Sequence, residues 1–111
     1  MSRLLLVFVL ICVLPASVSA GHSGDATLGP YVIQLASVKS AAAAEGEWSR
    51  LQKSHPDLLG DMELTVQEAD LGARGIFFRI RTGPFPNLTT AKDMCWQLRA
   101  ENLDCLVVRL K

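Results

Sequence analysis

The chain has 111 residues, a formal net charge of zero and a hydrophobic content of 50%. This length accommodates one small domain, because domains typically contain about 100–200 residues. The balanced charge argues against a general nucleic-acid-binding protein, which needs a basic surface and a high isoelectric point.

Residues 1–20 have the composition of a secretory signal peptide. Their single charged side chain is Arg3, an apolar run extends from Leu4 to Leu14, and small residues precede a cleavage site after Ala20. The run is too short for a membrane anchor, which needs about 20 apolar residues. We therefore expect an exported, soluble protein. The remaining 91 residues have a net charge of −1 and a hydrophobic content of about 44%, which is ordinary for a globular domain.

The next segments predict a flexible leader, a strand and a helix. Residues 21–30 are rich in glycine and polar residues, as is typical of a leader. Residues 31–37 are rich in β-branched and aromatic side chains, which predicts a strand. Ser37 or Ser40 can cap the helix that follows, and Pro56 must end it. Its predicted buried residues recur at helical spacing: Ala41, Ala44, Trp48 and Leu51.

Two further strands, a second helix and a last strand complete the pattern. Residues 63–70 alternate between apolar and polar side chains, which predicts a half-buried strand. A glycine-containing turn leads into a strand at 76–82, which Gly83-Pro84 ends. Asn87 can cap a helix, and 105–110 form the last strand. The apolar stripe of this second helix consists of Ala91, Met94, Cys95 and Leu98.

This order of elements predicts an α+β, ferredoxin-like βαββαβ fold, with a four-stranded antiparallel sheet and two helices on one face. The other face stays open to solvent, and we expect a binding site there. By alternation, its residues are Val32, Gln34, Ala36, Phe77, Arg79, Arg81, Leu106 and Val108. The same alternation places Arg109 on the helix side of the sheet. An aromatic ring beside guanidinium and amide groups suits a polyhydroxylated ligand. The alternative is that Arg79 and Arg81 only keep an exposed sheet face soluble.

Residues with catalytic chemistry are scarce. His55 is the one histidine in the predicted folded region, and its position at a helix end favours a solvated or capping role. Neither a phosphate-binding glycine loop nor a metal-ligand cluster is present in the sequence. We therefore expect no enzymatic activity, no cofactor and no metal.

Cys95 and Cys105 would reach an oxidising compartment after export, which permits one disulfide between them. The alternative is that both are small buried side chains with free thiols. Two cysteines ten residues apart with no histidine nearby do not form a metal site.

Two motifs resemble the SPOR (sporulation-related repeat) domain. Residues 31–37, with the alanine-rich helix that follows, resemble the opening of that domain. Residues 78–85 resemble the most specific motif of the SPOR domain, an arginine-containing strand that leads into Gly-Pro-Phe. The resemblance extends from Tyr31 to about Leu110, so the predicted SPOR-like domain covers residues 31–111.

The resemblance implies a non-catalytic module of the bacterial periplasm that binds peptidoglycan glycan strands lacking stem peptides. Such strands arise at the division septum, so it also implies a link to cell division. The implied glycan-binding residues are Gln34, Ser37, Phe77, Arg79 and Leu106, with Arg81 as an additional cation. Ala36 stands where the family often has glycine. The alternative function is a protein-interaction module of the same fold, which docks an envelope or cell-division protein. In either case we expect a monomer that binds no nucleic acid and keeps no membrane anchor after cleavage.

Overall fold

The computed structural model describes residues 29–111, so the predicted signal peptide and nearly all of the predicted leader lie outside the described residues. Four strands and three α-helices follow one another as β1 (Tyr31–Val38), α2 (Ala41–Ser54), α3 (Pro56–Leu59), β2 (Thr65–Asp70), β3 (Ile76–Phe85), α4 (Leu88–Ala100) and β4 (Leu106–Arg109). This order confirms the predicted α+β arrangement. The short helix α3 was not predicted.

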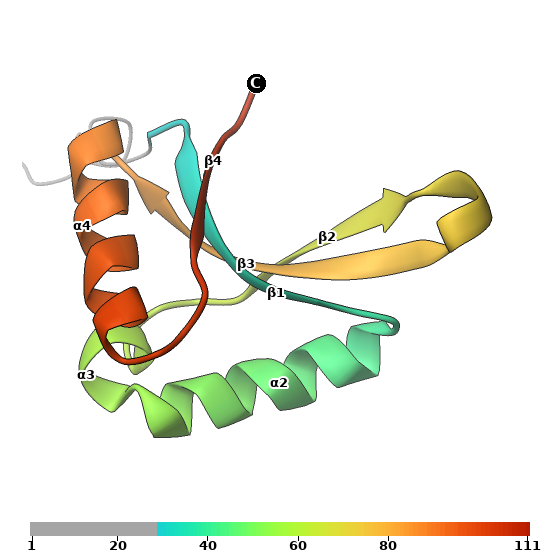
Figure 1. Cartoon of the computed structure of the whole chain (residues 1–111), viewed down its shortest axis with the longest axis horizontal. Helices are drawn as coiled ribbons and strands as arrows, with labels where there is room; N and C mark the ends of the chain where they lie inside the picture. The colour runs from blue at the N-terminus through green and yellow to red at the C-terminus, as the bar shows by residue number, and fades with distance from the viewer. Residues whose placement is uncertain (1–28) are drawn as a thin grey trace, which may run out of the picture.

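The four strands form one antiparallel sheet in the order β2-β3-β1-β4. The two long strands β1 and β3 are therefore central, while β2 and β4 are the edges. Figure 1 shows α2 and α4 on the same side of the sheet, with the β2–β3 hairpin extending past them. This topology confirms the ferredoxin-like fold class.

The hydrophobic core lies between the sheet and the helices. Helix α2 contributes Ala44, Trp48 and Leu51, and α4 contributes Ala91, Cys95 and Leu98. They pack against buried strand residues such as Ile33, Leu35 and Ile80. Burial of each Leu or Ile side chain stabilises the fold by about 1.5–3 kcal/mol, so this single layer supplies most of the stability.

Helix α2 begins where Ser40, one of the two predicted caps, accepts a 3.0 Å hydrogen bond at its Oγ from the backbone N–H of Ala43. Ala41 was predicted to be buried, but it is exposed. It belongs to the same stripe as Ala44 and Trp48, yet it lies in the first turn, at the end of the helix near the projecting hairpin (Figure 1).

The junction of α2 and α3 gives His55 a structural role. Its backbone N–H donates to the Leu51 carbonyl at 2.9 Å, which confirms the capping role. Its side chain is only 11% exposed, so the predicted solvated position is wrong. Glu101, at the end of α4, places its Oε1 2.5 Å from His55 Nδ1. Pro56 ends α2 as predicted, and it then occupies the first turn of α3, where a proline needs no hydrogen-bond donor.

Strand β3 is longer than the sequence predicted, because it continues through Gly83 and Pro84 to Phe85. The buried ring of Phe85 returns to the core opposite Tyr31. Gly83, two residues before Phe85 in β3, has a positive φ of 144°, a backbone conformation that favours glycine. A Cβ at this position would lie 3.2 Å from both the Tyr31 carbonyl oxygen and Val32 Cγ1. The backbone conformation and the close neighbours therefore both require glycine at position 83.

Two glycine substitutions should change stability in opposite directions. Gly83→Ala forces a strained φ beside a close neighbour, so we expect a loss of about 1–3 kcal/mol. Gly46→Ala places a methyl group in open space inside α2, where nothing lies within 4 Å. It should gain about 0.5–1 kcal/mol from helix propensity. Urea denaturation of both variants measures the two shifts, and a neutral Gly83→Ala would contradict the constraint.

Candidate functional site

The sheet face away from the helices carries two rows of side chains that run across the strands. Pairing places Ser37 and Gln67 on either side of Arg79, which we call the Arg79 row. The neighbouring Arg81 row consists of Thr65, Arg81, Gln34 and Leu106. Directly opposite residues in a sheet have Cβ atoms about 4.5–5.5 Å apart, so each row is one contiguous strip, polar throughout except for Leu106 at the end of the Arg81 row.

A β-bulge in β1 brings Gln34 and Ser37 to the same face. Gln34 pairs with Arg81 and Ala36 pairs with Ile80, so Leu35 is an extra residue in β1. Leu35 and Ala36 both contact the core, and Ser37 then returns to the face of Arg79. The prediction that Ala36 lies on the open face is therefore wrong, because strict alternation does not hold across a bulge.

Gln34 and Arg81 form a fixed pair within the Arg81 row. Arg81 Nε donates to Gln34 Oε1 at 2.9 Å. A guanidinium only donates, so the amide oxygen faces Arg81 and the amide nitrogen is left as the donor for a ligand. Arg81 is only 8% exposed. Burial, and secondly the positive charge of Arg79, lower the pKa of Arg81 from its ordinary value.

The structure therefore separates the two arginines that the sequence treats alike. Arg79 is half-buried and sits in the row with Ser37, whereas Arg81 is buried and braces Gln34. Val32 is also buried, so the predicted open face is closed at one end. The other end of this face, around Arg79 and Ser37, is open.

Phe77 lies on this face beyond Arg79, opposite Ala69 of β2. Lys39, which follows β1, places its Nζ 6.0 Å from the centroid of the Phe77 ring. This distance is at the outer limit of a cation–π contact. The sequence pattern does not predict Lys39 as a site residue, because Lys39 lies outside the predicted strand. At the opposite end of the sheet, Arg109 is exposed and lies 5.8 Å from the Tyr31 ring, which confirms its predicted helix-side position.

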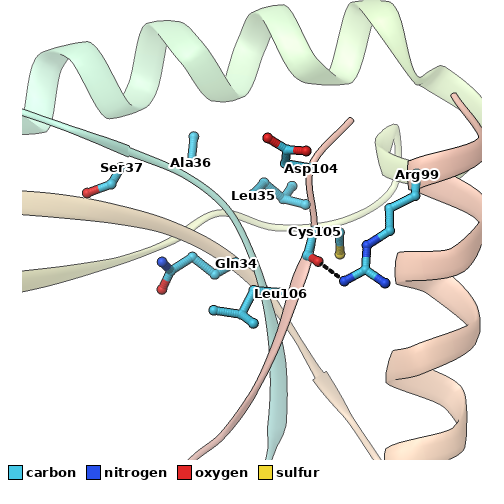
Figure 2. A pocket seen from close by; sticks show the side chains of 8 residues that line it. All are labelled: Gln34, Leu35, Ala36, Ser37, Arg99, Asp104, Cys105 and Leu106. Carbon is cyan, nitrogen blue, oxygen red and sulfur yellow. Dashed lines mark hydrogen bonds between the residues drawn. The ribbon is translucent and has the colours of Figure 1, made fainter. Parts of the chain in front are cut away.

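A groove opens at the edge of the sheet, beside the part of β1 that extends beyond the first residue of β4. Because β4 begins at Leu106, opposite Gln34, the following residues of β1 have no strand beside them on that edge. The groove, which we call the sheet groove, has a volume of about 450 Å³. It is lined by Gln34, Leu35, Ala36, Ser37, Arg99, Asp104, Cys105 and Leu106 (Figure 2).

The sheet groove thus gathers three of the predicted site residues, Gln34, Ser37 and Leu106. Arg79 borders it through its neighbour Ser37, while Phe77 lies farther along the same face. Arg99 and Asp104 were not predicted, because they come from α4 and the following loop rather than from the sheet. Figure 2 shows Arg99 reaching from α4 to the carbonyl oxygen of Cys105, to which its Nη2 donates.

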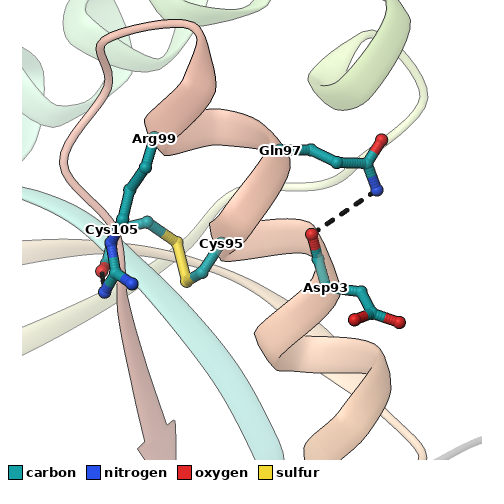
Figure 3. The surroundings of a disulfide bond; sticks show 5 residues. All are labelled: Asp93, Cys95, Gln97, Arg99 and Cys105. Atoms are coloured by element: carbon teal, nitrogen blue, oxygen red, sulfur yellow. Dashed lines mark hydrogen bonds between the residues drawn. A yellow bond between two sulfur atoms is a disulfide. The ribbon is translucent and has the colours of Figure 1, made fainter.

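The Cys95–Cys105 disulfide holds the two walls of this region together. It joins the buried side of α4 to the residue before β4, with a Cα–Cα distance of 5.2 Å (Figure 3). Of the two alternatives that the sequence left open, the structure has the bonded one. The start of β4 is consequently fixed to α4 at the groove.

Neither a metal centre nor a membrane helix is apparent in residues 29–111. No group of three or more metal-ligating side chains is present there. None of the helices within this range has the length and apolar character needed to cross a bilayer.

Comparison with known proteins gives a matching family model and a similar sequence. The sequence model of the SPOR domain matches residues 27–109. The uncharacterized protein RP066 of Rickettsia prowazekii is 29% identical over 77 residues, which are 69% of this chain and 35% of that protein. The chain thus spans about a third of the length of this relative.

Two solved structures have a similar fold. One is the peptidoglycan binding domain of the B. subtilis cell wall lytic enzyme CwlC, with 17% identity, a TM-score of 0.53 and coverage of 73% of this chain and 89% of that one. The other is the RlpA SPOR domain from Pseudomonas aeruginosa, with 18% identity, a TM-score of 0.52 and coverage of 71% and 97%. Both similarities support the predicted four-stranded α+β architecture.

The different roles of the two arginines should appear in stability. Arg81→Ala removes a buried side chain and leaves Gln34 Oε1 without its donor, so we expect a loss of about 1–3 kcal/mol. Arg79→Ala should change stability by no more than about 0.5 kcal/mol. Urea denaturation measures both. Gln34→Ala should cost less in the Arg81→Ala background than alone, and additive effects would contradict the pairing.

Loss of the disulfide should destabilise the domain. Closing a loop of this length restricts the unfolded chain and contributes about 2–3 kcal/mol. A reductant should therefore lower the urea midpoint of the wild type. The double variant Cys95→Ala/Cys105→Ala is the control, because its midpoint should not respond to reductant. An unchanged wild-type midpoint would argue that the bond contributes nothing.

Proposed function

Because this chain belongs to the SPOR domain family, we propose that it binds peptidoglycan in the bacterial envelope and catalyses no reaction on it. The observation that carries the proposal is the convergence of Gln34, Ser37 and Arg79 on one face of the sheet. The B. subtilis domain of similar fold is a peptidoglycan binding domain, which supports the same ligand class here.

The chemistry of these side chains fits the glycan part of peptidoglycan. The Gln34 amide nitrogen and the Arg79 guanidinium are donors for sugar hydroxyl and acetamido oxygens, and Ser37 both donates and accepts. Leu106, 56% exposed beside them, offers an apolar surface to the C–H face of a sugar ring. Phe77 adds an aromatic ring farther along the same face. Arg81 contributes by orienting Gln34.

The preferred ligand in this proposal is glycan without stem peptides. Removal of the peptide from the lactyl group of each muramic acid leaves a free carboxylate in place of an amide. A carboxylate is a stronger acceptor for a guanidinium than an amide oxygen, because the hydrogen bond is charge-assisted. Arg79 on the sheet face, and Arg99, which lines the sheet groove together with Asp104, are two cations near this ligand path.

The location follows from the sequence rather than from the described residues. Export through the predicted signal peptide, with cleavage after Ala20, delivers the domain to the periplasm. Glycan without stem peptides arises at the division septum, so binding it would concentrate the protein there. The alternative partner is an envelope or cell-division protein that docks on the same face. In either case the protein acts as a monomer and takes no cofactor.

Sedimentation with purified sacculi tests the proposal. Protein purified from the periplasm of an expression host should sediment with amidase-treated sacculi and much less with untreated ones. Arg79→Ala should weaken binding about 10- to 100-fold, because one charge-assisted hydrogen bond contributes about 1.5–3 kcal/mol. Arg74→Ala, at the exposed tip of the β2–β3 hairpin, is the matched control and should bind normally.

Failure of the wild type to sediment with either preparation would refute glycan binding and favour the protein-docking alternative. Equal sedimentation of Arg79→Ala and the wild type would remove Arg79 from the site. Equal binding to treated and untreated sacculi would retain peptidoglycan as the ligand and refute the preference for glycan without stem peptides.

A further inference from the structure

Helix α4 exposes a tryptophan that the fold does not need. Trp96 is 73% exposed, the highest value among the large apolar side chains in residues 29–111. It points away from the buried stripe of α4, whereas Trp48 of α2 is buried in the core. An exposed tryptophan commonly marks a binding surface, because its ring offers a large contact area at little entropic cost.

Trp96 lines a second groove of about 320 Å³, which we call the helix groove. Its lining residues among the described ones are Lys92, Cys95, Trp96, Arg99, Leu106 and Val107. The groove therefore lies between α4 and the edge strand β4. A smaller hollow bounded by Trp96, Arg99 and Ala100 adjoins it on the helix.

The helix groove adjoins the sheet groove, because Leu106 and Arg99 line both. Leu106 is more than half exposed and lies between Gln34 on one side and Trp96 on the other. A ligand that occupies the sheet groove has a direct path over Leu106 onto α4.

The path is fixed in position by two interactions at its centre. The Cys95–Cys105 disulfide ties α4 to the residue before Leu106, and Arg99 donates to the Cys105 carbonyl. Figure 3 shows Cys95 and Arg99 on successive turns of α4, and both reach Cys105. Little ordering of this surface is needed when a ligand binds, which favours affinity.

The charges of the helix groove match a carboxylate-bearing sugar. Its described lining includes two cations, Lys92 and Arg99, and no acidic side chain. A muramic acid without its peptide has a free lactyl carboxylate together with a ring whose C–H face can stack on indole. This pairing of an aromatic ring with nearby cations suits a repeating polymer whose every second sugar is anionic.

We propose that the helix groove is a second glycan subsite, in which Trp96 stacks on a further sugar of the same strand and Lys92 and Arg99 face its carboxylate. The inference rests on the proposed function, because it extends the path of that ligand. It makes binding depend on strand length: a short fragment fills the sheet groove alone, and a longer one reaches Trp96 as well.

Glycan fragments of two and of six disaccharides, prepared by amidase treatment and partial glycosidase digestion, test this dependence with the exported protein. The wild type should bind the longer fragment about five- to tenfold more tightly than the shorter one, the range expected for one aromatic stack. Trp96→Ala should lose this difference and bind the shorter fragment like the wild type. Ile76→Ala removes another exposed apolar side chain, at the start of β3, and should retain the difference.

Fluorescence gives an independent readout, because Trp48 and Trp96 are the two tryptophans of the chain. Acrylamide should quench Trp96 and leave the buried Trp48 largely unaffected. The longer fragment should protect Trp96 from quenching, and the shorter one should not. In the variant Trp96→Phe both the quenchable emission and its protection should be absent, which assigns the signal to Trp96.

The outcomes separate this inference from the function on which it rests. If the wild type binds neither fragment, glycan binding fails and the second subsite fails with it. If both fragments bind but Trp96→Ala keeps the length dependence and Trp96 stays open to acrylamide, the second subsite alone is overturned. Protection of Trp96 by a purified envelope protein, and not by glycan, would also overturn it and assign the helix groove to protein docking.

Discussion

The extra residue in β1 at Leu35 is the constraint on which the binding face depends. In a regular strand Gln34 and Ser37 would lie on opposite faces, because their separation is odd. The bulge turns Leu35 and Ala36 both toward the core and returns Ser37 to the row of Arg79. A bulge costs one unpaired position in the ladder, and the burial of Leu35 under the helices offsets that cost. The polar face and the hydrophobic core are therefore set by the same local irregularity.

This bulge also marks where reasoning from the sequence succeeded and where it failed. Alternation placed Phe77, Arg79 and Arg81 correctly, because β3 is regular over these residues. It failed at Ala36, since a small apolar side chain is compatible with either face and nothing in its neighbours signals an inserted residue. The family resemblance gave Gln34 and Ser37 together without the reason, and the register shift supplies it.

Burial is the second property that the sequence could not supply. Arg79 and Arg81 are equivalent by composition and by parity, yet one is half-buried and the other is almost completely buried against Gln34. This difference arises from neighbouring strands, which local patterns do not describe. A buried guanidinium is tolerated only where its donors find acceptors, and the Gln34 amide oxygen is such an acceptor. Two like residues thereby differ in role: Arg79 is proposed to contact the ligand, and Arg81 orients the Gln34 side chain.

The groove exists because β4 is short. Had β4 begun two or three residues earlier, it would pair with β1 beyond Gln34 and fill the space where the ligand is proposed to bind. Cys105, the residue before β4, is bonded to Cys95 of α4 and is buried. Arg99 then occupies the Cys105 carbonyl, which would otherwise be available to a neighbouring strand. The residue before β4 is thus held by α4 through both its side chain and its carbonyl, at the point where the proposed binding surface begins.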